Sequence, residues 1–100
     1  MAVQMVGGMG TEAMSATEEV QQIADSLKIE IETKAGKQFS VFVVKSFKTQ
    51  IVAGVNYFMK IHVGNDEYLH ARVYKSLPPG KISLHDLLMQ KTAVDEICYF

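Results

Sequence analysis

The stretch "VNYFMKIHVGNDEYLHARVYKSL", residues 55–77, decides the fold because it holds two alternating apolar patterns on either side of one polar turn. Apolar side chains take every second position over residues 55–63, and alternation returns within residues 67–77. Such alternation is typical of strands that bury one face. The turn "GNDE" (64–67) between the two segments predicts an antiparallel hairpin.

The two apolar rows also predict how these strands pair. We expect Val63 to lie opposite Leu69 and Met59 to lie opposite Val73, because this register gathers both rows on one face. A shift by a single residue would send every apolar side chain of one strand to the other face.

Further segments extend the sheet on both sides of the hairpin. "FSVFVVKSFK" (39–48) is rich in Val and Phe and predicts a preceding strand. The turn "LPPGK" (77–81) cannot continue a ladder of hydrogen bonds, so it ends the second strand of the hairpin. "KISLHDLLMQ" (81–90) fits either a loop or a short helix, and "AVDEICYF" (93–100) predicts the last strand.

One helix is predicted ahead of the strands, over residues 17–34. Ser15 stands three residues before Glu18, the spacing of a capping box, and Gly36 is a natural helix end. One apolar stripe follows at helical spacing: Val20, Ile23, Ala24, Leu27 and Ile31. We therefore expect an α+β fold with one N-terminal helix packed on an antiparallel β-sheet.

Length and composition indicate one ordinary globular domain. The chain has 100 residues and a formal net charge of −1, which gives no reason to expect nucleic acid or an anionic membrane as partner. Residues 1–14 are rich in Met and Gly and predict a flexible N-terminal arm before a single domain over residues 15–100. The sequence offers no membrane-spanning apolar run and no pattern of a secretory signal. Cys98 is the single cysteine, which indicates a reducing compartment.

The connection "QIVAG" (50–54) is unusual because turns are normally built from Gly, Pro, Asn, Asp and Ser. In a meander every second connection falls at the same end of the sheet. We therefore expect "LPPG" (77–80) to share an edge with this apolar turn, and "GNDE" (64–67) to lie at the opposite edge. An apolar tip usually folds back on its own core, and the alternative is that it stays bare to bind a partner.

Several motifs, in order, resemble the cystatin family. "QIVAG" is similar to the Gln-x-Val-x-Gly signature of cystatins, and "SFKTQIVAGVNYFMKIHVG" (46–64) resembles their first hairpin. A glycine-bearing N-terminus, "LPPG" and a final "DEICYF" (95–100) extend the resemblance over nearly the full chain. The length, the single cysteine and the missing signal resemble the intracellular stefin (type 1) branch.

The resemblance implies a reversible, tight-binding inhibitor of papain-like cysteine proteases, such as papain and the lysosomal cathepsins, and not an enzyme. Such an inhibitor blocks the active-site cleft with a three-part wedge and is not cleaved. Carried over to this chain, the protease-binding residues are Met5, Val6, Gly7, Gly8, Gln50, Ile51, Val52, Ala53, Gly54, Leu77, Pro78, Pro79 and Gly80. Either Gly7 or Gly8 could match the family glycine, and numbering from the helix favours Gly8.

The remaining expectations concern partners, location and chemistry. The resemblance implies a cytoplasmic protein, with the nucleus as an alternative location, and a monomer with strand-exchanged dimers as an alternative state. We expect no cofactor and no metal site, because His62 and His70 facing each other across a strand pair would supply only two ligands. Cys98 is expected to be a half-buried strand thiol rather than a nucleophile. A scaffold with the same fold and another partner is the other non-enzymatic hypothesis.

Overall fold

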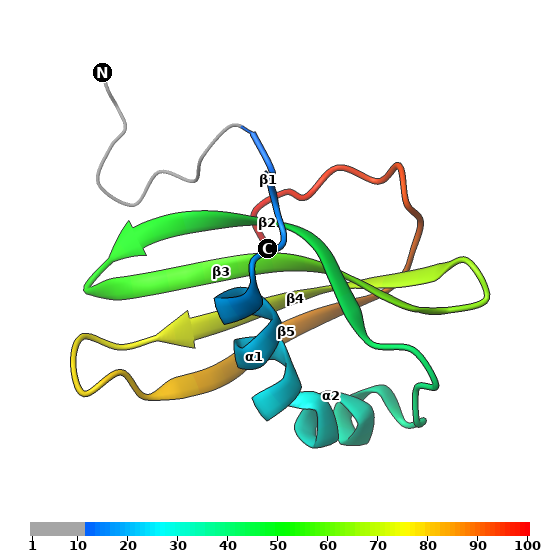
Figure 1. The fold of residues 1–100 in the computed structure, drawn as a ribbon, viewed down its shortest axis with the longest axis horizontal. Coiled ribbons are helices and arrows are strands. Elements are labelled where there is room, and N and C mark those ends of the chain that lie inside the picture. The colour runs from blue at the N-terminus through cyan, green and yellow to red at the C-terminus, as the bar shows by residue number, and fades with distance from the viewer. Residues whose placement is uncertain (1–11) are drawn as a thin grey trace.

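Strands and two helical pieces follow one another in the computed structural model, which describes residues 12–100. The elements in chain order are β1 (Met14–Ser15), α1 (Glu18–Ser26), α2 (Lys28–Ala35), β2 (Val43–Val52), β3 (Gly54–Gly64), β4 (Glu67–Lys75) and β5 (Ile82–Lys91). The strands form one antiparallel sheet in the order β1-β2-β3-β4-β5 (Figure 1). The predicted α+β class is confirmed.

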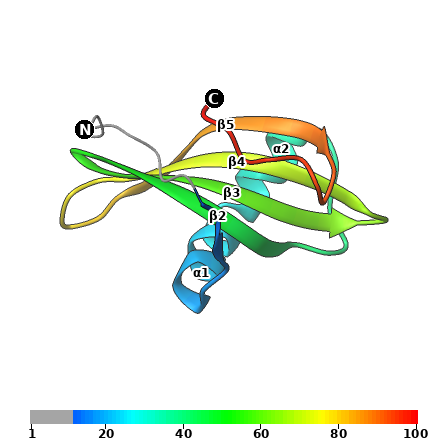
Figure 2. The same cartoon turned by 90° about the horizontal axis from the view of Figure 1, so that it is seen from above.

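Both helical pieces lie against the same face of the sheet, which twists across them (Figure 2). The predicted helical stripe is buried and belongs to one core cluster: Val20, Ile23, Ala24, Leu27 and Ile31. The inward rows of β3 and β4 add Met59, Ile61, Leu69, Ala71 and Val73 to this cluster. The alternation of the two strands therefore identified the buried face correctly.

The register of β3 against β4 differs from the prediction. Leu69 lies opposite Ile61 and Met59 lies opposite Ala71, so both predicted pairs are wrong by two residues. The turn is tighter than expected because residues 65–66 form it alone, both with positive φ. A shift by two positions keeps the same side chains on the buried face, and the core is unchanged by it.

The helix begins two residues later than the capping-box interpretation required. Thr17 Oγ1 accepts a hydrogen bond from the Val20 N–H at 3.2 Å, so Thr17 is the N-cap. Ser15 belongs to β1 and pairs with β2, and the proposed box with Glu18 is wrong. Gly36 ends α2 with a φ of 78°, as predicted.

The helix is also divided at Leu27, where we expected it to be continuous. The Leu27 N–H donates to the Ala24 carbonyl oxygen at 3.0 Å, three residues back instead of four. Next to it, the Ser26 hydroxyl donates to the Ile23 carbonyl oxygen at 2.7 Å. Such local contacts tighten a turn and bend a helix, which lets α1 and α2 follow the curved sheet.

The first long strand lies later in the chain than residues 39–48. β2 runs over Val43–Val52 and carries a register shift between Val44 and Ser46. Phe39 and Phe42 are buried in the core from the segment that leads into β2. These two residues are therefore apolar because they are buried in the core, although they take no part in the hydrogen bonding of the sheet.

Residues 81–90 are neither loop nor helix but contribute most of β5. Val73 pairs with Leu84 while Arg72 pairs with Asp86, so a bulge shifts the register inside this strand. Before the bulge the core-facing apolar residues take even positions, Ile82 and Leu84, and after it they take odd positions, Leu87 and Met89. Because the alternation of apolar residues is interrupted at the bulge, the sequence pattern did not identify this strand.

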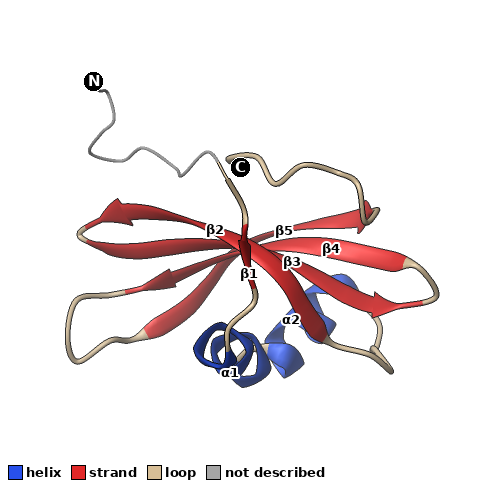
Figure 3. Ribbon diagram, turned by 45° about the horizontal axis from the view of Figure 1, so that its top comes forward, coloured by secondary structure: helices blue, strands red, loops and turns tan. Residues whose placement is uncertain are grey.

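Residues 93–100, which we expected to be the last strand, instead cross the sheet face opposite the helices (Figure 3). Lys60 Nζ donates to the carbonyl oxygens of Ala93 and Asp95 at 2.7 and 2.5 Å. Side chains of the sheet, rather than a backbone ladder, therefore fasten this segment. Cys98 is exposed on it, not half-buried in a strand.

His70 lies on this same face and is 1% exposed. Burial, followed by the positive charges of Lys60 and Lys91, lowers the pKa of its imidazole from 6.5 to about 4, against a smaller opposing effect of Asp95. Between these two pH values the unfolded chain binds a proton at His70 and the folded chain does not. The free energy of unfolding should therefore fall by about 1.4 kcal/mol for each pH unit from pH 6.5 down to pH 4.

The measurement is urea unfolding of the protein and of a His70→Gln variant at pH 7, 6, 5 and 4. Subtracting the two free energies of unfolding removes the titration of the carboxylates that both proteins share. The difference should change by about 3 kcal/mol across the series, in the direction that disfavours the parent at low pH. Parallel curves for the two proteins would contradict a neutral buried imidazole.

Candidate functional site

Two connections with apolar residues lie at one end of the sheet, as predicted. The β2–β3 connection, centred on Ala53, and the β4–β5 connection share this end, while the β3–β4 turn lies at the other end (Figure 1). We call residues 50–54 and 77–80 together the tip edge. Because β2 to β5 form one continuous sheet, both parts of the tip edge are carried by a single rigid support.

The apolar side chains of the tip edge are exposed. Ile51 is 62% exposed, Val52 is 37% exposed and Leu77 is 62% exposed. Pro78 and Pro79 are exposed as well. The usual arrangement, in which an apolar tip folds back on its own core, is therefore wrong for these residues. Neighbouring exposed apolar side chains are typical of a surface that binds a partner.

Gln50 holds the base of the first hairpin rather than its tip. Its side chain is buried at 9% exposure, and its Oε1 accepts a hydrogen bond from Asn56 Nδ2 at 2.9 Å. The two residues are register partners on β2 and β3. A buried side-chain bridge directly behind the exposed residues stiffens the hairpin.

Gly54 is required by the backbone geometry of the tip. Its φ is 109°, a conformation that other residues rarely adopt. A Cβ atom at this position would lie 2.4 Å from the Lys75 carbonyl oxygen and 2.9 Å from the Tyr74 hydroxyl. Only glycine therefore allows β3 to start this close to the end of β4.

The second connection is closed by its own hydrogen bonds. The Ser76 N–H donates to the Lys81 carbonyl oxygen, and the Lys81 N–H donates to Ser76 Oγ, both at 2.9 Å. Within the loop the Gly80 N–H donates to the Leu77 carbonyl oxygen at 3.0 Å. These contacts present Leu77 on a short, well-tied loop.

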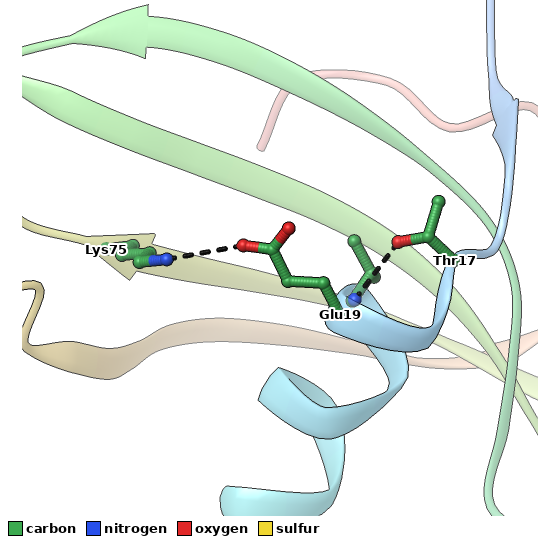
Figure 4. A network of polar contacts seen from close by, with 4 residues as sticks. Thr17, Glu19 and Lys75 are labelled. Carbon is green, nitrogen blue, oxygen red and sulfur yellow. Dashed lines mark hydrogen bonds and ion pairs between the residues drawn. The ribbon is translucent and has the colours of Figure 1, made fainter.

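One ion pair links the end of β4 to the start of the helix. Lys75 Nζ lies 3.4 Å from a carboxylate oxygen of Glu19, whose helix begins at the Thr17 cap (Figure 4). Glu19 is exposed and Lys75 is partly exposed, so water screens the pair and it adds little to stability.

Sequence reasoning missed Tyr74, which joins the first part of the tip edge to the end of β4. Its hydroxyl donates a hydrogen bond to the Ala53 carbonyl oxygen, and its ring stacks on His85 of β5 at 5.5 Å between centroids. The expected register would have placed Tyr74 opposite Phe58, well away from the tip. The observed register places it opposite Asn56, two residues from Gly54.

The other predicted binding residues are Met5, Val6, Gly7 and Gly8, and they lie outside the described residues. The nearest described element is β1, whose Met14 pairs with Phe47 of β2. The predicted role of the arm remains a prediction.

The remaining candidates from the sequence do not form a site. His62 lies opposite Tyr68 and His70 lies opposite Lys60, so the two histidines do not face each other. Residues 12–100 contain no group of three metal-ligating side chains. Within the same part of the chain, no helix has the length and apolar character needed to cross a membrane.

A helical layer on one sheet, with two exposed apolar connections at a single edge, is typical of a module with a partner-binding surface. The chain belongs to the cystatin family: the Cystatin domain model matches residues 4–98. Cystatins are inhibitors and not enzymes, so the expectation of a non-enzymatic protein is confirmed by this membership.

Three relatives of nearly the same length as this chain are each named Cystatin-B. Cystatin-B of Oplegnathus fasciatus is 45% identical over 98 residues, which cover 96% of this chain and 97% of the relative. Cystatin-B of Paralichthys olivaceus is 45% identical, and Cystatin-B of Homo sapiens is 42% identical, each over 96% of this chain and 100% of the relative. The resemblance to the stefin branch is thereby confirmed.

Proposed function

We propose that the protein inhibits papain-like cysteine proteases by inserting the tip edge, as a wedge, into their active-site cleft. Inhibition of cysteine proteases is the function of the family to which the chain belongs. The single observation that carries the wedge is the exposure of Ile51, Val52 and Leu77 on two adjacent connections. A cleft with apolar subsites would bury these side chains, which the fold leaves in water.

The energetics of such a wedge are favourable. Burying a fully exposed Val or Ile side chain contributes about 1.5–3 kcal/mol. Ile51 is 62% exposed and Val52 is 37% exposed, so their burial in a cleft would contribute about 1–2 and about 0.5–1 kcal/mol, before the cost of association is subtracted. The cost is reduced because the support is rigid: Gln50 and Asn56 brace the first hairpin, and hydrogen bonds close the second loop. None of these residues needs to react chemically, which is consistent with an inhibitor that is released intact.

The N-terminal arm is the third part of the proposed wedge. β1 runs antiparallel to β2, so the chain that leads into Met14 approaches from the tip end of β2. This direction supports an arm that reaches the tip edge. We propose that Met5 and Val6 enter substrate subsites, and that Gly7 and Gly8 turn the chain away before a peptide bond reaches the catalytic thiolate.

The finer points of the function are also proposals. We propose papain and the lysosomal cathepsins as targets, a cytoplasmic location with the nucleus as alternative, and a monomeric inhibitor that can exchange strands into dimers. The family relationship supports the first two, and the β-rich architecture supports the third.

Titration of active papain with the protein tests the proposal directly. Turnover should fall linearly and vanish near equimolar protein, because a tight one-to-one complex leaves no free cleft. Mass spectrometry of the recovered protein should show an uncleaved chain. Unchanged turnover at micromolar protein would instead favour a scaffold with another partner, and steady cleavage would show that the chain is a substrate.

A further inference from the structure

The hydroxyl of Tyr74 links the first part of the tip edge to the end of β4, the strand that leads into the second part. Tyr74 is the last residue but one of β4, close to the second connection, and its hydroxyl donates to the Ala53 carbonyl oxygen at the tip of the first connection. Ala53 lies between the exposed Val52 and the constrained Gly54. This contact therefore ties down the one residue around which the first hairpin turns.

The Tyr74 ring has little freedom to move. One side stacks on His85 of β5, with ring centroids 5.5 Å apart and an interplanar angle of 29°. The hydroxyl lies so near β3 that a Cβ on Gly54 would approach it to 2.9 Å. The stacking on His85 and the close approach of the hydroxyl to β3 keep this hydroxyl at one place, so the carbonyl that accepts its hydrogen bond is also held.

We propose that Tyr74 is a positioning residue, which fixes the tip of the first hairpin relative to the second connection. This inference rests on the proposed function, since it names a residue that shapes the protease-binding edge without itself entering the cleft. A free hairpin tip would have to be ordered when the complex forms. Holding Ala53 before binding removes part of that entropic cost.

A Tyr74→Phe variant keeps the ring and its stacking on His85 and removes only the hydroxyl. The inhibition constant for papain should rise by about three- to tenfold, which matches the net value of one hydrogen bond. Tyr68→Phe is the matched control, because Tyr68 lies at the other end of the sheet, where its ring packs on His62. This control should inhibit papain as the parent does.

Amide hydrogen exchange separates positioning from general destabilisation. In Tyr74→Phe the amides of residues 52–54 should exchange faster, whereas those in the middle of β3 and β4 should keep the parental rates. Exchange that accelerates throughout the sheet would show a merely structural role and would overturn the proposal. Parental inhibition by Tyr74→Phe would overturn it as well.

The two hypotheses fail in different ways. If the parent protein itself does not inhibit papain, the proposed function fails, and the exchange rates at residues 52–54 still report whether Tyr74 holds the tip. If the parent inhibits and Tyr74→Phe matches it, only the positioning role fails.

Discussion

A Val52→Asp variant is expected to fold normally and to lose at least about 100-fold in affinity for papain, equivalent to about 2.7 kcal/mol. Val52 is 37% exposed at the end of β2, so a carboxylate there remains in water in the free protein. In the complex the same carboxylate would enter an apolar cleft without a partner, and burying an unpaired charge costs several kcal/mol. The measurement is the inhibition constant for papain, together with the thermal unfolding midpoint.

Val94→Asp is the matched control for this substitution. Val94 is 90% exposed and belongs to the C-terminal segment, on the sheet face opposite the helices. The same chemical change at this position should leave both inhibition and stability at the parental values. Equal inhibition by the two variants would mean that Val52 does not enter the cleft.

A Gly54→Ala variant is expected to lose both stability and inhibition. The new Cβ would lie 2.4 Å from the Lys75 carbonyl oxygen, and the backbone would keep an unfavourable φ of 109°. The free energy of unfolding should fall by about 1–3 kcal/mol. Relief of the contact must displace the hairpin tip from β4, so the inhibition constant per folded molecule should rise by about tenfold or more.

A Gly36→Ala variant is the control that distinguishes the cost of positive φ from the cost of the steric clash at residue 54. Gly36 also has a positive φ, of 78°, but a Cβ there would meet nothing within 4 Å. This variant should lose about 1 kcal/mol of stability and none of its inhibition. Unfolding by urea gives both stabilities, and active-site titration gives the fraction of competent inhibitor. If Gly54→Ala resembles Gly36→Ala in both properties, the close approach of β3 to β4 does not shape the binding edge.

The sequence was sufficient to predict the architecture because buried residues recur at regular spacings along strands and helices. Alternation in residues 55–63 marked the inward face of β3, and the helical stripe marked the face that covers it. Alternate connections of a meander share an end, so the position of the tip edge followed from the strand order alone.

The register was not predictable in the same way, because the buried face tolerates any shift of two residues. The backbone of Asn65 and Asp66 decides between these registers, since both residues adopt positive φ in a tight turn. This error concealed Tyr74, whose contact with Ala53 exists only in the observed register.

The other misses have local causes. The bulge in β5 breaks the period that identifies a strand, so residues 81–90 were ambiguous. Residues 93–100 have the composition of a strand, but buried side chains such as Lys60 capture their carbonyl groups instead. Composition alone does not distinguish a ladder partner from a segment fastened by side chains.

A crystal structure of the one-to-one complex with papain tests the central claim most directly. Papain with a blocked catalytic thiol serves, because the proposed wedge forms no bond to that group. We predict that residues 50–54 and 77–80 lie inside the cleft and that the turn at residues 64–67 remains in solvent. A complex in which the cleft holds another part of the chain, with Val52 and Leu77 still bare, would contradict the proposed wedge.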